Sequence, residues 1–452
     1  MPRIEEFGVE PIPAELRTIR WPGLFAINFT FFLNPVMYVL GALAVASSGL
    51  PLWWAVAAIA IGQAIAYVVM IPIAEVGVDY GLPGQVALRS TLGFWGARVL
   101  SSPYRVVAAT YWFAAQAIAA GLAIQAVVGA MGGGHVPLVP VALGVAAFHA
   151  TLAVLGFDVM RWLLRVVLPI SLAFTAVLVA LYVTTSDHLF AVGRVFHSPD
   201  QHLTWLGFAT VVTVIAGSSL TLVTNVADTC RYTPTRRDVR IGLFASAIAA
   251  VVVDAFVGGY AAAATGETNP FVAVAALTAS KPLLAVLLVA IVVQGIAANI
   301  VNVYTAGLSL VNTLPVLGRL RATLLVAAGA IALSALPDVV SHAQRWIVHL
   351  GNVASPLAGV VLADYLVRKR RRIDVAALFD RDGAYRYLNG VNVPAFLAVA
   401  AGIALYYTLP HDWLKIVWGI AAGAIVYLVL CRLQAAVAGS YHVRARLKPG
   451  TR

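Results

Sequence analysis

Long apolar segments recur along the whole chain, and they constrain its fold more than any other feature. Hydrophobic residues make up 61% of the 452 residues and charged residues only 11%, whereas a soluble domain carries roughly 25% charged residues. A chain so poor in charge cannot cover a surface that faces water, so its surface is expected to face a lipid bilayer. A membrane helix satisfies its own backbone hydrogen bonds, and each segment of about 20 apolar residues therefore predicts one spanning helix.

These segments predict an all-α integral membrane protein with about twelve transmembrane helices. The ninth of these segments, at 322–337, is the shortest. We place the spans near residues 22–47, 52–74, 99–131, 137–157, 163–184, 204–227, 239–264, 282–313, 322–337, 346–367, 391–409 and 413–435.

The basic residues predict the orientation of the chain. The N-terminal segment is polar and mixed in charge, without the apolar stretch of a cleavable signal peptide. Most of the 30 Lys and Arg residues fall in alternate connecting segments, which the positive-inside rule assigns to the cytoplasm. The predicted external segments carry Arg194, Lys281, Arg345 and Lys415. We therefore expect a multi-pass protein of the inner cell membrane with both termini in the cytoplasm.

Composition also weighs against other classes of protein. The net charge of +11 comes from short loops and not from a basic stripe interleaved with aromatics, so no nucleic-acid partner is expected. Cys230 and Cys431 stand alone, and no histidines have the spacing of a metal site, so no cofactor or metal is predicted. No catalytic motif is recognisable, which leaves a membrane enzyme or a non-transporting receptor as a remote alternative. The oligomeric state is not predicted.

Two of the predicted helices are interrupted near their middle. The first contains Asn34-Pro35, where proline removes a backbone donor and clashes with the preceding turn. The sixth contains Gly217-Ser218-Ser219, which are poor helix formers with free hydroxyls. Breaks in helices 1 and 6 are the relation expected between two five-helix repeats of opposite topology that bind substrate near the bilayer midplane. The alternative is that each helix is merely kinked.

The chain divides accordingly into seven predicted segments. They are a cytoplasmic N-terminal segment at 1–21, a first transmembrane repeat at 22–184, an external loop at 185–203, a second transmembrane repeat at 204–367, a basic cytoplasmic loop at 368–390, two further helices at 391–435 and a cytoplasmic tail at 436–452.

Polar side chains inside the spans are candidate binding residues, because they are costly in lipid and usually face the interior of the bundle. Trp112 and Gln116 share one helix face, where an indole and a carboxamide can stack on a flat heterocycle and bond its edge. Asn299 and Asn302 lie in the eighth span, either for binding or for hydrogen bonds between helices. Asp254 is an isolated acid in the seventh span, either a proton carrier or a structural acid.

Six motifs follow one another along nearly the whole chain. The leader contains GVEPIP at 8–13, the connection after the second span contains YGLP at 80–83, and the third span contains WFAAQ at 112–116. ADTCRYTP follows the sixth span at 227–234, ANIVNVY lies in the eighth at 298–304, and LADY ends the tenth at 362–365. In this order they resemble the nucleobase:cation symporter family, which includes the purine-cytosine, cytosine, hydantoin and allantoin permeases.

The resemblance implies a LeuT-type fold, with a five-plus-five inverted repeat, discontinuous helices 1 and 6, and two extra C-terminal helices. It implies symport of a small heterocycle, such as cytosine or a purine, by alternating access. Carried over by position, Trp112 would be the stacking platform and Gln116 a hydrogen-bond partner. Together with the break residues, the predicted binding residues are Asn34, Trp112, Gln116, Ser218, Ser219, Thr221, Asn299 and Asn302.

Two departures from the family pattern bear on substrate and ion. Ser219 stands where the family's sixth helix supplies a second aromatic, which leaves room for a different heterocycle, such as a hydantoin, allantoin or a vitamin precursor. Ala297 and Ala298 stand where sodium-dependent members have hydroxyl ligands, and methyl groups cannot bind sodium. Proton coupling is therefore predicted, with Asp254 as the candidate carrier and sodium coupling as the alternative.

Overall fold

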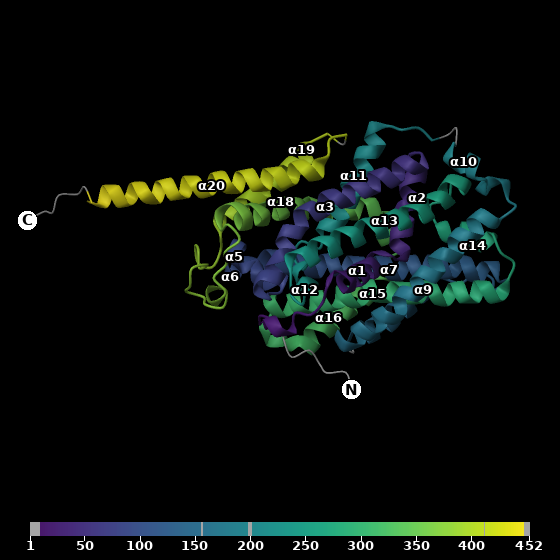
Figure 1. The fold of residues 1–452 in the computed structure, drawn as a ribbon, viewed down its shortest axis with the longest axis horizontal. Helices are drawn as coiled ribbons and strands as arrows, with labels where there is room; N and C mark the ends of the chain where they lie inside the picture. The colour runs from purple at the N-terminus through teal and green to yellow at the C-terminus, as the bar shows by residue number, and fades with distance from the viewer. Residues whose placement is uncertain (1–9, 155–156, 198–200, 411, 447–452) are drawn as a thin grey trace, which may run out of the picture.

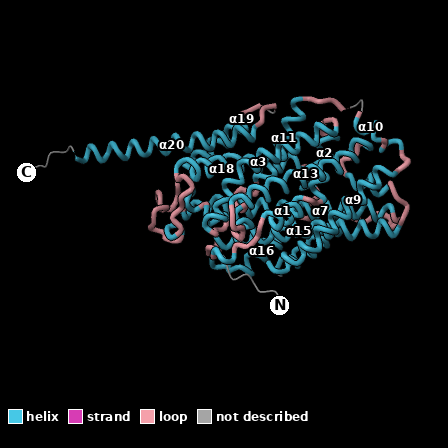
Figure 2. The backbone as a smooth tube through the Cα atoms, viewed as in Figure 1, coloured by secondary structure: helices cyan, strands magenta, loops and turns pink. Residues whose placement is uncertain are grey.

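The computed structural model describes residues 10–154, 157–197, 201–410 and 412–446, and every regular element within these ranges is a helix (Figure 1, Figure 2). Residues 1–9 and 447–452 of the two predicted terminal segments lie outside this description. The main helices are α1 (Trp21–Phe32), α2 (Pro35–Ala46), α3 (Leu52–Tyr80), α7 (Ser102–Ala130), α8 (Leu138–Val154), α9 (Phe157–Thr184), α11 (Trp205–Leu220), α13 (Arg236–Thr265), α15 (Lys281–Thr313), α16 (Gly318–Leu333), α18 (Ala343–Ala363), α19 (Val393–Thr408) and α20 (Lys415–Arg446).

Each predicted span coincides with an apolar helix in the described part of the chain. Among the described residues, eight helical segments are long and apolar enough to cross a membrane, and the bent pair α1–α2 makes a ninth. The shorter apolar helices α8, α11 and α19 stand at the three remaining predicted positions. On the outside of the long helices, the side chains of Val286, Val289 and Ile425 are at least 60% exposed. Such a surface suits contact with lipid.

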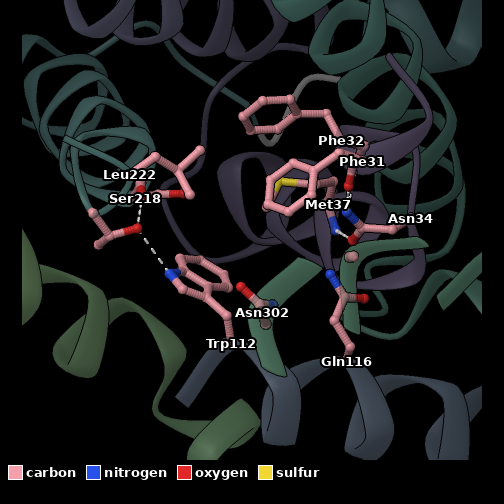
Figure 3. Close-up of a pocket in the computed structure, with 11 residues that line it drawn as sticks. Phe31, Phe32, Asn34, Met37, Trp112, Gln116, Ser218, Leu222 and Asn302 are labelled. Atoms are coloured by element: carbon pink, nitrogen blue, oxygen red, sulfur yellow. Dashed lines mark hydrogen bonds between the residues drawn. The ribbon is translucent and has the colours of Figure 1, made fainter. Parts of the chain in front are cut away.

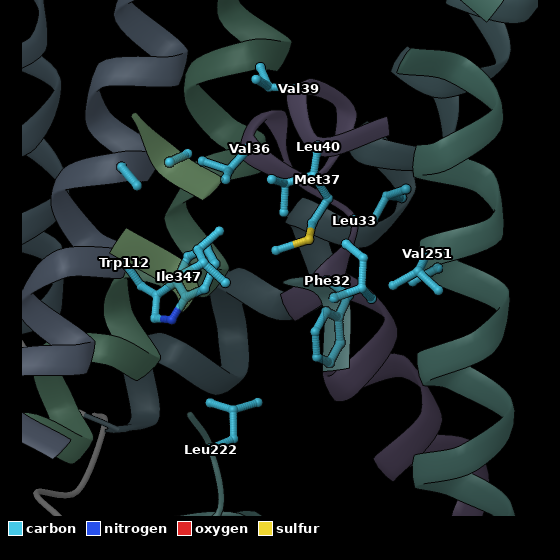
Figure 4. Packing of buried hydrophobic residues seen from close by; sticks show 14 of the residues in the cluster. Phe32, Leu33, Val36, Met37, Val39, Leu40, Trp112, Leu222, Val251 and Ile347 are labelled. Carbon is cyan, nitrogen blue, oxygen red and sulfur yellow. The ribbon is translucent and has the colours of Figure 1, made fainter. Parts of the chain in front are cut away.

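The first span is broken at the predicted position. Only Leu33 and Asn34 separate α1 from α2, and the two helices are inclined by 62°. Pro35 takes the first position of α2, where its missing N–H would have no partner in any case. The break is buried in a hydrophobic cluster that includes Phe32 and Met37 (Figure 4). Its irregular backbone is thus enclosed by protein, as membrane depth requires.

The sixth span is interrupted later than predicted, so the predicted position at 217–219 is wrong by a few residues. These residues remain helical, and α11 ends at Leu220. Gly217 does not break the helix but lets α11 pack closely on Gly351 of α18. Residues 221–226 then form tight turns with hydrogen bonds from residue i+3 to residue i, including Val223 N to Leu220 O. The short helix α12 (Ala227–Cys230) follows.

The helices pack in three groups. The first contains the broken span with α3, α11 and α13, and the second is built on the long pair α7 and α15 with α8, α9 and α16. In the third group, α18 packs on α11 and on the last two helices, and the end of α20 projects beyond the rest of the molecule (Figure 1). Gly258 of α13 lies so close to α2 that an added Cβ would be 1.8 Å from the carbonyl oxygen of Tyr38.

Three short helices connect α3 to α7 where the sequence predicts only a loop: α4 (Gly84–Ala87), α5 (Arg89–Leu92) and α6 (Phe94–Gly96). Arg89 is buried and donates to Asn312 Oδ1 at 2.5 Å and to the carbonyl oxygen of Leu378 at 3.3 Å. Burial, with a smaller effect of the Arg98 charge, lowers the pKa of Arg89 to about 10. Its guanidinium therefore stays charged at neutral pH and fastens the connection to the end of α15.

Candidate functional site

A pocket lies beside the break in the first span, between α1, α2, α7, α11 and α15 (Figure 3). Its volume of about 20 Å³ holds little more than one water molecule, so a larger ligand has to displace its walls. The lining combines aromatic and aliphatic side chains with amides and hydroxyls. It consists of Phe31, Phe32, Asn34, Met37, Trp112, Gln116, Ser218, Thr221, Leu222, Ala298 and Asn302.

Six of the eight predicted binding residues border this pocket: Asn34, Trp112, Gln116, Ser218, Thr221 and Asn302. They come from four segments that are far apart in the sequence, so their meeting is a property of the fold. The aromatic wall that the sequence lacks on the sixth helix is supplied from α1, where the ring of Phe31 borders the same space as Trp112 (Figure 3). Phe31 was not predicted, because several phenylalanines precede the break without any pattern that distinguishes one of them.

The Trp112 indole is held in a fixed plane. Its Nε1–H donates to Thr221 Oγ1 at 3.0 Å, and the Thr221 hydroxyl donates to the carbonyl oxygen of Ser218 at 2.6 Å. The ring thereby ties α7 to the end of α11. One turn further along α7, the carboxamide of Gln116 has no hydrogen-bond partner for its buried Oε1 among the described residues. Gln116 therefore has an acceptor to spare for a ligand.

Asn34 stabilises the break itself. Its Nδ2 donates to the carbonyl oxygens of Phe31 and Phe32, each at 2.9 Å, and its Oδ1 accepts from Met37 N at 3.2 Å. The side chain thus satisfies two carbonyls at the end of α1 and one amide at the start of α2. Since these contacts use both ends of the amide, Asn34 shapes the pocket more than it offers free polar groups.

A buried arginine fixes the orientation of Asn302. The side chain of Arg105 is fully buried and donates to Asn302 Oδ1 at 3.1 Å and to Thr305 Oγ1 at 2.7 Å and 3.0 Å. A guanidinium can only donate, so the oxygen of Asn302 must face Arg105 and its amino group is left for the pocket. Arg105 was not among the residues predicted from the sequence. Its position seven residues, or two helical turns, before Trp112 was the available signal.

The other two predicted residues bond elsewhere. Ser219 donates its hydroxyl to Gln63 Oε1 on α3. The amide nitrogen of Asn299 lies 2.9 Å from His149 Nδ1, and His149 Nε2 lies 2.9 Å from the carbonyl oxygen of Val292. Because a carbonyl can only accept, His149 carries its proton on Nε2 and accepts from Asn299 on Nδ1. His149 and Gln63 were not predicted, because each is an isolated polar residue within an apolar segment.

A second cavity adjoins the pocket, with a volume of about 50 Å³. It extends towards Tyr67, Asp228 and α13, and it shares Phe31 and Leu222 with the pocket. These two side chains therefore separate the pocket from the second cavity. Their displacement would join the two spaces into one path.

Asp254 lies apart from the pocket, on the face of α13 that packs against α2. Its side chain is 1% exposed, and neither carboxylate oxygen has a hydrogen-bond partner among the described residues. Gly41 of α2 packs against its backbone, and the hydroxyl of Tyr38 is its titratable neighbour on that helix. Within the described part of the chain, no three His, Cys, Asp or Glu residues are grouped as they would be to hold a metal ion.

Comparison with known protein families matches residues 11–430 to the family described as "Permease for cytosine/purines, uracil, thiamine, allantoin". The chain belongs to this permease family. The permease is thus a multi-pass membrane transporter of the nucleobase:cation symporter group and not an enzyme, which confirms the resemblance read from the six motifs.

Two curated relatives cover most of the permease. It is 23% identical over 427 residues to the hydantoin permease of Microbacterium maritypicum, across 91% of this chain and 85% of that relative. It is 24% identical over 482 residues to the allantoin permease of Bacillus subtilis (strain 168), across 95% of this chain and 94% of that relative.

A solved structure also resembles the permease over nearly its whole length. This is Mhp1, a nucleobase-cation-symport-1 family transporter, in a closed conformation with bromovinylhydantoin bound. The TM-score is 0.81 at 20% sequence identity, with 96% of each chain covered. The likeness supports the all-helical LeuT-type fold, while the count of twelve spans and the five-plus-five arrangement stay predictions.

Proposed function

We propose that the permease imports a small planar heterocycle by proton symport, with cytosine or another nucleobase as the first candidate. The observation that carries this proposal is the pocket at the broken first span. There the indole of Trp112 is held in plane by Thr221, and the amides of Gln116 and Asn302 border the same space. A flat ring can stack on the indole, at about 1–3 kcal/mol per base, while its polar edge bonds the amides.

The proposed cycle is alternating access between two repeats of opposite topology. In this proposal the short helices α8, α11 and α19 also span the membrane, which brings the number of spans to twelve with both termini in the cytoplasm of the cell. The partition formed by Phe31 and Leu222 supports such a cycle, because a small movement of two side chains would open the pocket on one side. The discontinuous first and sixth spans supply the backbone freedom for that movement.

Proton coupling is favoured over sodium coupling by the side chains near the pocket. Ala297 and Ala298 offer no oxygen ligands, and Ala298 borders the pocket itself. Asp254 offers a site for a proton, since an uncompensated charge at such depth is very costly. A carboxyl that is neutral when buried can release its proton when water reaches it.

A hydantoin or allantoin is the second candidate substrate, and sodium coupling would then be the alternative mechanism. The side chain that α11 presents to the pocket is Ser218, not an aromatic ring. A smaller ring with more polar edges suits such a wall better than a purine does. The names of the hydantoin and allantoin permeases among the relatives favour the same class.

Uptake of a panel of labelled heterocycles by cells that lack their own permeases tests both candidates. The panel is assayed with and without sodium and with a protonophore. We expect uptake of one nucleobase that the protonophore abolishes and sodium does not alter. Trp112→Ala and Gln116→Ala should abolish it with normal membrane insertion, whereas Trp418→Ala, at an exposed indole, should not. Sodium-dependent uptake would refute the coupling proposal, and unchanged uptake by both pocket variants would refute the site.

A further inference from the structure

A separate cavity of about 260 Å³ lies between α11, α18, α19 and the start of α20. These four helices pack together on the side of the molecule away from α7 and α15 (Figure 1). None of the residues that line this cavity lines the pocket at the broken span. It is therefore a distinct space, about ten times larger, to which the transport cycle assigns no role.

The cavity contains a buried cation that has no counter-ion within the described part of the chain. Lys415 is the first residue of α20 and is 8% exposed, and no acidic side chain pairs with it among the described residues. The Nζ atom of Lys415 lies 6.0 Å from the centroid of the Tyr406 ring. An ammonium group withdrawn from water is costly unless an anion or several acceptors compensate it. The lining thus lacks a negative partner.

Two hydroxyls in the same lining are also unsatisfied. The hydroxyl of Tyr406, a residue that is 1% exposed, and Oγ1 of Thr213, a residue that is 7% exposed, have no hydrogen-bond partner among the described residues. Buried polar groups are normally hydrogen-bonded. Two donors and a cation that converge on one cavity are the groups that bind an oxyanion.

The surroundings of the cavity indicate where its mouth lies. Exposed aromatic side chains cluster at the same ends of these four helices: Trp205, Trp346, Trp413 and Trp418 are 45–57% exposed, and Tyr407 is 58% exposed. Tryptophan and tyrosine gather at the level of lipid headgroups in membrane proteins. The cavity therefore opens at the bilayer interface and not into the core of the bundle.

We propose that this cavity binds the phosphate of an anionic phospholipid headgroup. The ammonium of Lys415 pairs with the phosphate oxygens, and the hydroxyls of Tyr406 and Thr213 donate to them. Free inorganic phosphate has the same chemistry, but the aromatic belt at the mouth favours a headgroup whose acyl chains lie along α19 and α20. The bound lipid would hold α18 and α11 against the last two helices.

Native mass spectrometry of the purified full-length permease tests the proposal with three probes: phosphatidylglycerol, phosphatidylcholine and inorganic phosphate. We expect phosphatidylglycerol to bind at least tenfold more tightly than phosphatidylcholine. Lys415→Gln should weaken that binding about tenfold and Tyr406→Phe severalfold, while Lys415→Arg should retain it. The matched control is Lys281→Gln, because Lys281 is the exposed first residue of α15, and it should bind lipid as the unaltered protein does.

Three results would overturn the proposal. Equal binding of the two lipids, or equal effects of the Lys415 and Lys281 substitutions, would show that the cavity does not select a headgroup. Displacement of phosphatidylglycerol by millimolar inorganic phosphate would assign the cavity to a free oxyanion. Lys415→Arg keeps the positive charge, so lipid binding that is retained by this variant and lost by a Lys415→Gln variant with unchanged melting temperature is assigned to the charge.

Discussion

The contact between Arg105 and Asn302 gives the pocket a defined polarity. Because the guanidinium holds the oxygen of Asn302, the amide presents its N–H groups to the pocket. A ligand carbonyl or unprotonated ring nitrogen fits the amino group of Asn302, while a ligand amino group fits the unpaired Oε1 of Gln116 in the same lining. Arg105 thus acts on the ligand through its neighbour.

Replacement of Arg105 by methionine should raise the KM for uptake about 10- to 100-fold. The substitution leaves buried acceptors on Asn302 and Thr305 without a donor, at about 1–3 kcal/mol each, and lets the Asn302 amide rotate. Uptake kinetics in a double-mutant cycle provide the measurement. If Arg105 acts by orienting Asn302, the same substitution should add little in an Asn302→Ala background, and full additivity of the two effects would contradict the role.

Single residues also mark how far the sequence alone could predict the site. Trp112 and Gln116 were predictable because a large aromatic and an amide four residues apart in an apolar helix are rare and share a face. Phe31 was not, because its role depends on how far α1 bends at the break. Asn299 was predicted for the pocket, yet it bonds His149, a choice made by the packing of α8 and not by any local pattern.

At the scale of helices, the break between α1 and α2 depends on one side chain. Asn34→Ala removes the cap of α2, worth about 0.5–2 kcal/mol, and leaves the carbonyls of Phe31 and Phe32 without their donor. We expect a lower melting temperature in detergent and a maximal uptake rate reduced at least fivefold. Asn34→Ser keeps a cap acceptor but cannot reach both carbonyls. Its melting temperature and uptake rate should therefore lie between those of the unaltered protein and those of Asn34→Ala.

Asn269→Ala is the matched control for this prediction. Asn269 also precedes a proline and caps a helix, α14 (Pro270–Ala276), by accepting from Phe271 N at 3.2 Å. The substitution removes the same kind of cap away from the pocket, so it should lower the melting temperature slightly and leave uptake nearly unchanged. Equal losses of uptake in the two alanine variants would mean that the break has no special part in transport.

The helices themselves were largely predictable, because apolar length is a strong signal in a membrane protein. The first break was predictable as well, since proline acts locally. The sixth was misplaced because Gly217-Ser218-Ser219 are tolerated in a helix that packs closely on α18, while 221–226 contains neither glycine nor proline. Hydrogen bonds to distant segments accompany the irregular backbone at this position. Trp112 Nε1 donates to the Thr221 hydroxyl, and Gly84 N donates to the carboxylate of Asp228.

At the scale of the whole molecule, one ionic network joins segments that the transport cycle would have to separate or move together. Glu75 on α3 is 1% exposed and contacts Arg240 of α13 at 2.7 Å, Arg236 of α13 at 3.9 Å, and Arg371 in the segment after α18. The arginines are 30–55% exposed, so each single pair is partly screened by solvent.

Loss of one arginine from this network should therefore matter little. Arg371→Ala or Arg240→Ala alone should cost no more than about 1 kcal/mol of stability, because Glu75 keeps another partner. The double substitution leaves the buried carboxylate with only the distant Arg236 and should cost roughly 3 kcal/mol. Unfolding in detergent measures all three, and Glu75→Gln should suppress the extra loss in the double variant. Simple additivity would contradict a shared network.

The proposed coupling of substrate to protons would involve the whole molecule, and Asp254 is the residue at which it can be tested most directly. Asn has nearly the shape of a protonated aspartate, so Asp254→Asn should preserve the packing of α13 on α2 and the pocket beyond it. We expect this variant in proteoliposomes to exchange internal for external substrate at a near-normal rate. Its accumulation of substrate driven by a pH gradient should fall at least tenfold, because no proton can be bound and released at this position. Glu267→Gln, at an exposed acid just after α13, should retain both activities. Normal pH-driven accumulation by Asp254→Asn would exclude Asp254 as the proton carrier, and loss of exchange as well would assign it a structural role.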